Sequence, residues 1–93
     1  MARGQFLHIG FGFDGPPKVV ELIPVFNRAL DWVRYAPSCW IVWTTSSPEQ
    51  WYERLKPHLT AKDHVFIVPL DLGKGYFGWL SQEVWDWLSK QRA

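Results

Sequence analysis

The sequence predicts an α+β fold with the element order βαββαβ, one antiparallel sheet and an extra C-terminal helix. Apolar segments with strand character occur at residues 5–13, 39–45 and 65–70, and segments with helical periodicity lie between them. With 93 residues, the chain has the length of one domain. We therefore assign 1–93 to a single domain, with its core at 5–70 and a loop and helix at 71–93.

The first predicted strand, residues 5–13, alternates cleanly. One face carries Leu7, Ile9, Phe11 and Phe13, and the other carries Phe6, His8, Gly10 and Gly12. Because glycine is unfavourable inside a strand, Gly10 and Gly12 indicate that something packs closely on the second face. We expect a tryptophan ring there, from a neighbouring strand or from a partner chain.

A helix should follow the break at residues 14–17. Apolar residues recur at helical spacing in Val19, Leu22, Ile23, Phe26 and Leu30. Pro24 lacks the N–H that a mid-helix position donates, so we expect a kinked helix, or one that starts near Pro24, ending near Leu30.

Residues 31–36 fit two interpretations. They form either the last turn of the preceding helix or a short strand, with Trp32 and Arg34 on one face and Val33 and Tyr35 on the other. The turn at 36–38 then leads into the strand at 39–45. If both strands exist, they form a hairpin.

The second helix has the clearest start signal in the chain. Ser47 and Gln50 can exchange side-chain and backbone hydrogen bonds as a capping box, with Pro48 at the first helical position. Its apolar positions are Trp51, Leu55 and Leu59. Pro57 disfavours a regular helix at the residue before it, so Lys56 marks the expected end.

The strand at 65–70 should lie at a sheet edge or end there, because Pro69 cannot donate to a central ladder. The glycine-rich segment 71–78 is typical of a loop. A last helix is expected at 81–91, with Ser81 as its cap and with Trp79 and Leu80 anchoring it.

The strands at 39–45 and 65–70 are apolar on both faces, so the sheet requires a second buried surface besides the one under the two helices. Either the C-terminal helix covers it or a second copy of the chain does. We favour a homodimer in which the open faces meet, with Gly10 and Gly12 allowing close approach.

Charge and cysteine content narrow the functional classes. The chain has ten basic and nine acidic residues, and the basic residues are scattered along the sequence. This distribution gives no general reason to expect a polyanionic partner. The single cysteine, Cys39, lies in an apolar strand and is expected to be buried. No signal peptide or membrane-length apolar run is present, so we expect a cytoplasmic protein without a membrane partner.

The middle of the chain resembles a known family. Residues 36–70 read A-P-S-C-W-I-V-W-T-T-S-S-P-E-Q-W-Y-E-R-L-K-P-H-L-T-A-K-D-H-V-F-I-V-P-L. This run resembles the small CRISPR-associated Cas-two-like proteins, especially stand-alone bacterial relatives of unassigned function. The matching positions are Ser38, Trp40, Val42, Ser47, Leu55, Leu59, Asp63 and 65–70. The resemblance implies a ferredoxin-like fold, commonly dimeric, and favours a strand at 31–36.

The resemblance also implies a candidate metal ligand. Some family members are metal-dependent nucleases with an aspartate at the end of the first strand, and Asp14 matches that position. One carboxylate per chain could hold Mg²⁺ if a dimer axis paired two of them. An aspartate before Gly15 and Pro16 is also a frequent turn residue, and this alternative stays open.

No other residues form a catalytic or metal-binding pattern, since His8, His58 and His64 lack ligand spacing. We expect a small dimeric interaction or scaffold protein without a cofactor, whose partner is itself and whose further partners would be nucleic acid or another protein. The alternatives are a Mg²⁺-dependent nuclease acting through Asp14 and a non-catalytic nucleic-acid-binding module. The sequence assigns no catalytic residue and no nucleic-acid-binding residue.

Overall fold

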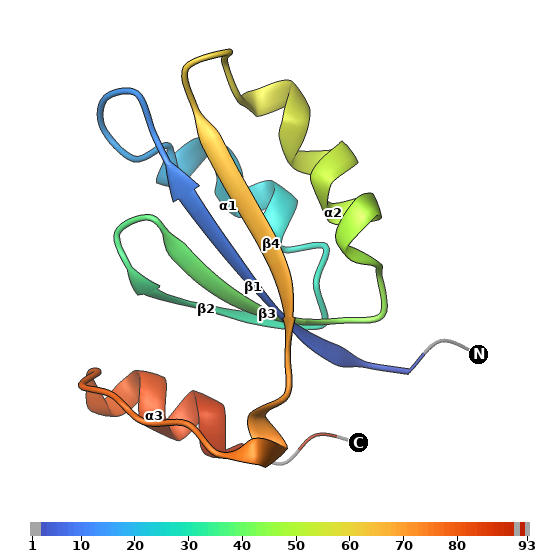
Figure 1. Cartoon of the computed structure of the whole chain (residues 1–93), viewed down its shortest axis with the longest axis vertical. Helices are drawn as coiled ribbons and strands as arrows, with labels where there is room; N and C mark the ends of the chain where they lie inside the picture. Colours follow the sequence, from blue (N-terminus) through green and yellow to red (C-terminus); the bar gives the residue numbers. More distant parts are fainter. Residues whose placement is uncertain (1–2, 91, 93) are drawn as a thin grey trace.

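A computed structural model describes residues 3–90 and 92 of the chain. Its elements are β1 (Gln5–Gly12), α1 (Val19–Phe26), β2 (Asp31–Ala36), β3 (Cys39–Thr44), α2 (Pro48–Leu55), β4 (His64–Leu70) and α3 (Gln82–Ser89), with short 3₁₀ turns η1 (Lys56–His58) and η2 (Leu72–Lys74). The four strands form one sheet in the order β2-β3-β1-β4, and every neighbouring pair is antiparallel (Figure 1). The predicted α+β class and antiparallel sheet are confirmed, and β4 lies at an edge as Pro69 predicted.

The main core lies between α1, α2 and one face of the sheet. It consists of Leu7, Ile9, Leu22, Val25, Phe26, Trp40, Val42, Trp51 and Leu55. The rings of Phe26 and Trp40 stack at 4.5 Å with an interplanar angle of 7°. Leu7 and Ile9 share this face, which confirms the alternation predicted for the first strand. Aromatic bulk supplies much of the buried surface in so short a chain.

Helix α2 begins as predicted. The Ser47 hydroxyl accepts from the Gln50 amide at 3.2 Å, and the Gln50 side-chain oxygen accepts from the Ser47 amide at 2.8 Å. The α-helix gives way to the 3₁₀ turn η1 at Lys56, directly before Pro57. These local contacts orient α2 so that Trp51 and Leu55 face the core.

Helix α1 begins at Val19, five residues before Pro24, so the alternative of a start near Pro24 is wrong. The helix ends at Phe26 rather than near Leu30. The early start follows from burial of Leu22 on the sheet, which the first turn must reach. The early end follows from the Leu30 amide, which donates to the Trp43 carbonyl at 2.9 Å and so draws the backbone toward the sheet.

Residues 31–36 form a strand, so the helical interpretation is wrong. Strand β2 pairs with β3 as a hairpin, with Val33 opposite Ile41 and Arg34 opposite Trp40. The register then shifts, because Ala36 pairs with Cys39 and Tyr35 is left as an extra residue. Such a bulge locally bends a strand and redirects its side chains.

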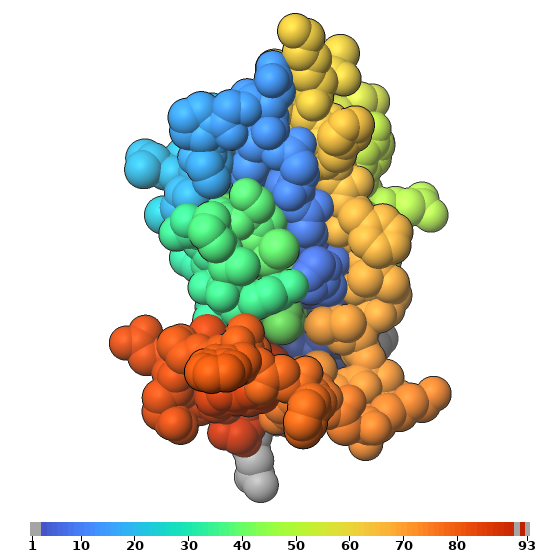
Figure 2. All heavy atoms as spheres, turned by 60° about the vertical axis from the view of Figure 1, so that its left-hand side comes forward, coloured from blue at the N-terminus to red at the C-terminus, as the bar shows by residue number. Residues whose placement is uncertain are grey.

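Helix α3 packs on the opposite face of the sheet, over one end only. Its Val84 and Leu88 form a second buried cluster with Ile41 of β3. Figure 2 shows this face, with α3 across the end of the strands and the rest of the strand surface uncovered. Leu80 packs on the cluster, whereas Trp79 is 98% exposed and does not anchor the helix. Ser81 lies at the N-cap position of α3, as predicted, although its side chain makes no capping hydrogen bond. The helix ends at Ser89, before the predicted end at position 91, which lies outside the described residues.

Within the described part of the chain, no helix has the length and apolar character needed to cross a membrane.

Candidate functional site on the uncovered part of the sheet

The uncovered part of the sheet carries an exposed aromatic ring beside glycine. Residues directly opposite each other share a face, and Gly10 lies opposite both Phe66 of β4 and Cys39 of β3. Two residues earlier on β1, His8 lies opposite Val68 of β4. Phe66 is 69% exposed, and the other residues of β4 are exposed or half-buried. We call the surface formed by His8, Gly10, Gly12, Tyr35, Cys39, Phe66 and Val68 the open face.

The side chains nearest to the two glycines of the open face belong to histidines and not to a tryptophan. A Cβ atom added at Gly10 would lie 3.0 Å from Cε1 of His8, two residues earlier on the same strand. At Gly12 the nearest side chain is His64 of β4. The predicted tryptophan ring does exist, but Trp43 lies over Gly4 instead. Gly10 therefore makes room for the imidazole of His8.

His8 and Tyr35 form a polar pair within this surface. Nε2 of His8 lies 2.6 Å from the Tyr35 hydroxyl, which the bulge in β2 places over the neighbouring strands. Burial, followed by a contact with Cys39, raises the pKa of Tyr35 to about 12. Burial also lowers the pKa of His8 below its ordinary value. At neutral pH both rings are uncharged and share one hydrogen bond.

This chemistry fits a surface that becomes buried. A neutral, hydrogen-bonded pair costs far less to desolvate than a charged group. A tyrosine with a raised pKa is a poor nucleophile at neutral pH, so the pair is not arranged for proton abstraction from Tyr35. Cys39 is half-buried here, less enclosed than its apolar strand predicted.

Asp14, the predicted metal ligand, lies exposed in the loop between β1 and α1. Its backbone amide donates to Oδ1 of Asp63 at 2.8 Å, whereas its own carboxylate makes no hydrogen bond with the described residues. Within residues 3–90 and 92, no three His, Cys, Asp or Glu side chains gather as metal ligands. Asp14 alone could contribute a carboxylate to a metal at this place.

Asp63, the carboxylate nearest to that loop, is already occupied. Its oxygens accept from the Asp14 amide, from Lys18 Nζ at 2.8 Å, and from the Thr60 amide and hydroxyl at 2.8 and 3.2 Å. None of its side chain is exposed. These donors, the Asp14 amide first, hold the pKa of Asp63 well below its usual range. Asp63 thus fastens the β1–α1 loop to the α2–β4 connection, which is a structural role.

Sequence reasoning predicted an open sheet face at Gly10 and Gly12 but missed the pair of His8 and Tyr35 and the exposed ring of Phe66 on it. Alternation placed His8 on the second face of its strand, but Tyr35 reaches it only because β2 pairs with β3 and bulges there. The exposure of Phe66 depends on how far α3 extends over the sheet. The available signal for Phe66 was the strand at 65–70, which is apolar on both faces and sits at an edge.

The geometry defines a small α+β domain whose antiparallel sheet carries α1 and α2 on one face and α3 over one end of the other. No family model, no curated protein and no solved structure matches this chain.

Proposed function

We propose that this chain is a small dimeric interaction or scaffold protein, with a ferredoxin-like fold, in which the open face binds a second copy. The fold assignment is supported by the strand order β2-β3-β1-β4 and by the packing of α1 and α2 on one face. The observation that carries the proposal is Phe66 of the edge strand β4, a large apolar side chain that is 69% exposed on the open face.

The open face has the shape for self-association. In a two-fold dimer the same patch serves both partners, so it must offer both a projection and a place to receive it. Phe66 is the projection, and the low surface over Gly12, which is exposed, lies one strand away. A partner can cover the neutral pair of His8 and Tyr35 beside it without burying an unpaired charge.

Helix α3 limits how the two copies meet. Because Val84 and Leu88 already occupy one end of the sheet, the whole faces cannot oppose each other. The dimer that we propose uses only the part around Phe66 and Gly12. Its direct test is the mass of wild-type protein and of a Phe66→Thr variant by sedimentation equilibrium over a wide range of concentrations.

A Mg²⁺-dependent nuclease is the second candidate, supported by the unpaired, exposed carboxylate of Asp14 at the end of β1. The reaction would need two such carboxylates brought together by a dimer axis. We expect Asp14→Ala to abolish any cleavage of labelled oligonucleotides in Mg²⁺ or Mn²⁺ if this candidate is right. Undiminished cleavage by the variant would eliminate the role of Asp14.

The same oligonucleotides, titrated with and without Mg²⁺, also test non-catalytic nucleic-acid binding. Binding without cleavage would support that third function, and the absence of both leaves the protein–protein role.

A further inference from the structure

A groove runs along the outer surface of α2, on the side of the sheet opposite to α3. It has a volume of about 710 Å³ and is lined by Arg28, Glu49, Gln50, Tyr52, Glu53, Arg54 and Pro57. Arg28 comes from the segment after α1, and the other lining residues come from α2 and η1. The groove is therefore formed where the end of α1 approaches α2.

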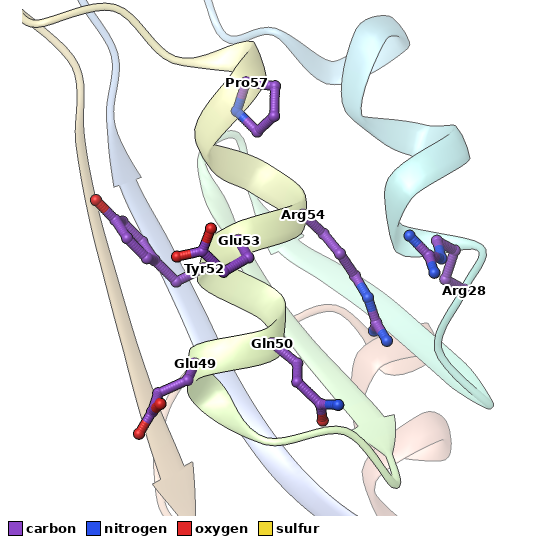
Figure 3. Close-up of a pocket in the computed structure, with 7 residues that line it drawn as sticks. All are labelled: Arg28, Glu49, Gln50, Tyr52, Glu53, Arg54 and Pro57. Atoms are coloured by element: carbon purple, nitrogen blue, oxygen red, sulfur yellow. The ribbon is translucent and has the colours of Figure 1, made fainter.

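Two arginines line this groove, and neither forms an ion pair with the described residues. In Figure 3 the side chains of Arg28 and Arg54 extend into the same space between α2 and the end of α1. Gln50 points to that side as well, whereas Glu49 and Glu53 project away from it. Within the described residues, no acidic oxygen lies within 4.0 Å of either guanidinium.

Arg54 is held in place although its hydrogen bonds are incomplete. Its guanidinium carbon lies 5.1 Å from the centroid of the buried Trp51 ring, a contact that fixes the direction of the side chain. Its Nη1 is buried and has no hydrogen-bond partner. Burial, and then the positive charge of Arg28, lower the pKa of Arg54. A buried N–H donor without an acceptor costs free energy, and a second positive charge nearby adds to that cost. An anion bound beside both arginines would reduce it.

We propose that this groove binds a phosphate group carried by a small ligand, held between Arg28 and Arg54. Guanidinium groups present parallel N–H donors that match the oxygens of phosphate, and two of them balance the charge of a dianion. Gln50 adds a further donor, because its side-chain oxygen is used by the cap of α2 while its amide nitrogen remains free toward the groove. The ring of Trp51 beneath Arg54 keeps the site rigid before the anion arrives.

The test measures the binding of inorganic phosphate to the full chain at constant ionic strength. Calorimetry measures the affinity directly, and thermal unfolding measures the change in melting temperature. We expect phosphate to raise the melting temperature of the wild-type protein, since a ligand of the folded state stabilises it, and we expect sodium acetate or chloride at the same ionic strength not to do so. Arg54→Gln and Arg28→Gln should each weaken phosphate binding about tenfold or more through loss of charge-assisted hydrogen bonds.

Arg28→Gln separates binding from folding. Arg28 is exposed, so the variant should fold, and removal of the repulsion should leave the melting temperature without phosphate unchanged or higher. Arg3→Gln removes an equal charge from another exposed position and should bind phosphate as the wild type does. The proposal is overturned if phosphate has no effect on the wild type, if acetate has the same effect, or if Arg28→Gln binds phosphate unchanged. Phe66→Thr should keep the phosphate response, so the site is tested independently of the dimer.

Discussion

The exchange of Phe66 for threonine tests the proposed dimer most directly. Threonine is β-branched, which suits a strand, and it removes the ring. Because Phe66 is 69% exposed, the ring contributes little to the folded monomer and would be buried only by a partner. The variant should therefore lose association and retain its fold.

The expected magnitude follows from the exposed area. A phenylalanine offers roughly 200 Å² for burial, so about 140 Å² of Phe66 remains available. At about 25 cal/mol per Å² this area is worth roughly 3.5 kcal/mol, and a two-fold dimer contains the ring twice. The loss should lie between about 3 and 7 kcal/mol, which is a factor of about 10² to 10⁵ in the dissociation constant.

Sedimentation equilibrium from micromolar to submillimolar protein measures this constant, and circular dichroism measures the melting temperature of the same samples. The matched control is Phe77→Thr, which removes an equally large, fully exposed ring from the loop before α3. We expect the control to associate as the wild type does. A wild-type protein that is monomeric throughout, or a Phe66→Thr variant with an unchanged dissociation constant, would refute the reasoning.

Three further predictions concern stability. Asp63→Asn should lower the melting temperature, because the lost charge frees Lys18 from its partner. The pKa of Asp63 in the folded protein lies below its ordinary value of 3.8, so the ionised carboxylate stabilises the fold fully above pH 3.8 and this stabilisation is lost as the pH falls further. Asp63→Asn should therefore lack this acid-induced loss of stability when unfolding is measured below about pH 4. The pKa of His8 in the folded protein lies below 6.5, so the folded state loses stability as the pH falls through 6.5 and the unfolded chain takes up a proton there. The melting temperature of His8→Asn should therefore drop less than that of the wild type between neutral and weakly acidic pH. An equal drop in both proteins would contradict this prediction. Leu88→Ala should cost about 2–5 kcal/mol in urea unfolding by emptying the cluster under α3, whereas the exposed Ser89→Ala should cost much less.

The short-range features of this fold could be predicted from the sequence. The capping box of Ser47 and Gln50 lies within four residues, and its donors and acceptors meet whenever the helix forms. The alternation of the first strand placed Leu7 and Ile9 on one face for a similar reason, since successive side chains of a strand point to opposite faces, and the structure buries both residues. Pro69 placed its strand at an edge through the missing N–H group.

The candidate sites depend on contacts between distant residues. The carboxylate of Asp63 accepts a hydrogen bond from the Asp14 amide, 49 positions away, so neither segment by itself predicts that Asp63 holds the loop that carries Asp14. His8 meets Tyr35 across 27 positions and only through a bulge that shifts the strand register.

By itself the sequence determined the types of the elements outside residues 31–36, their order and the grouping of side chains by face, because periodicity and capping act over a few residues. The tertiary structure decided the extent of α3 over the sheet, the exposure of Phe66 and the meeting of Arg28 with Arg54. Those features depend on how complete elements pack, and the free energy of packing is shared among residues that no local pattern connects.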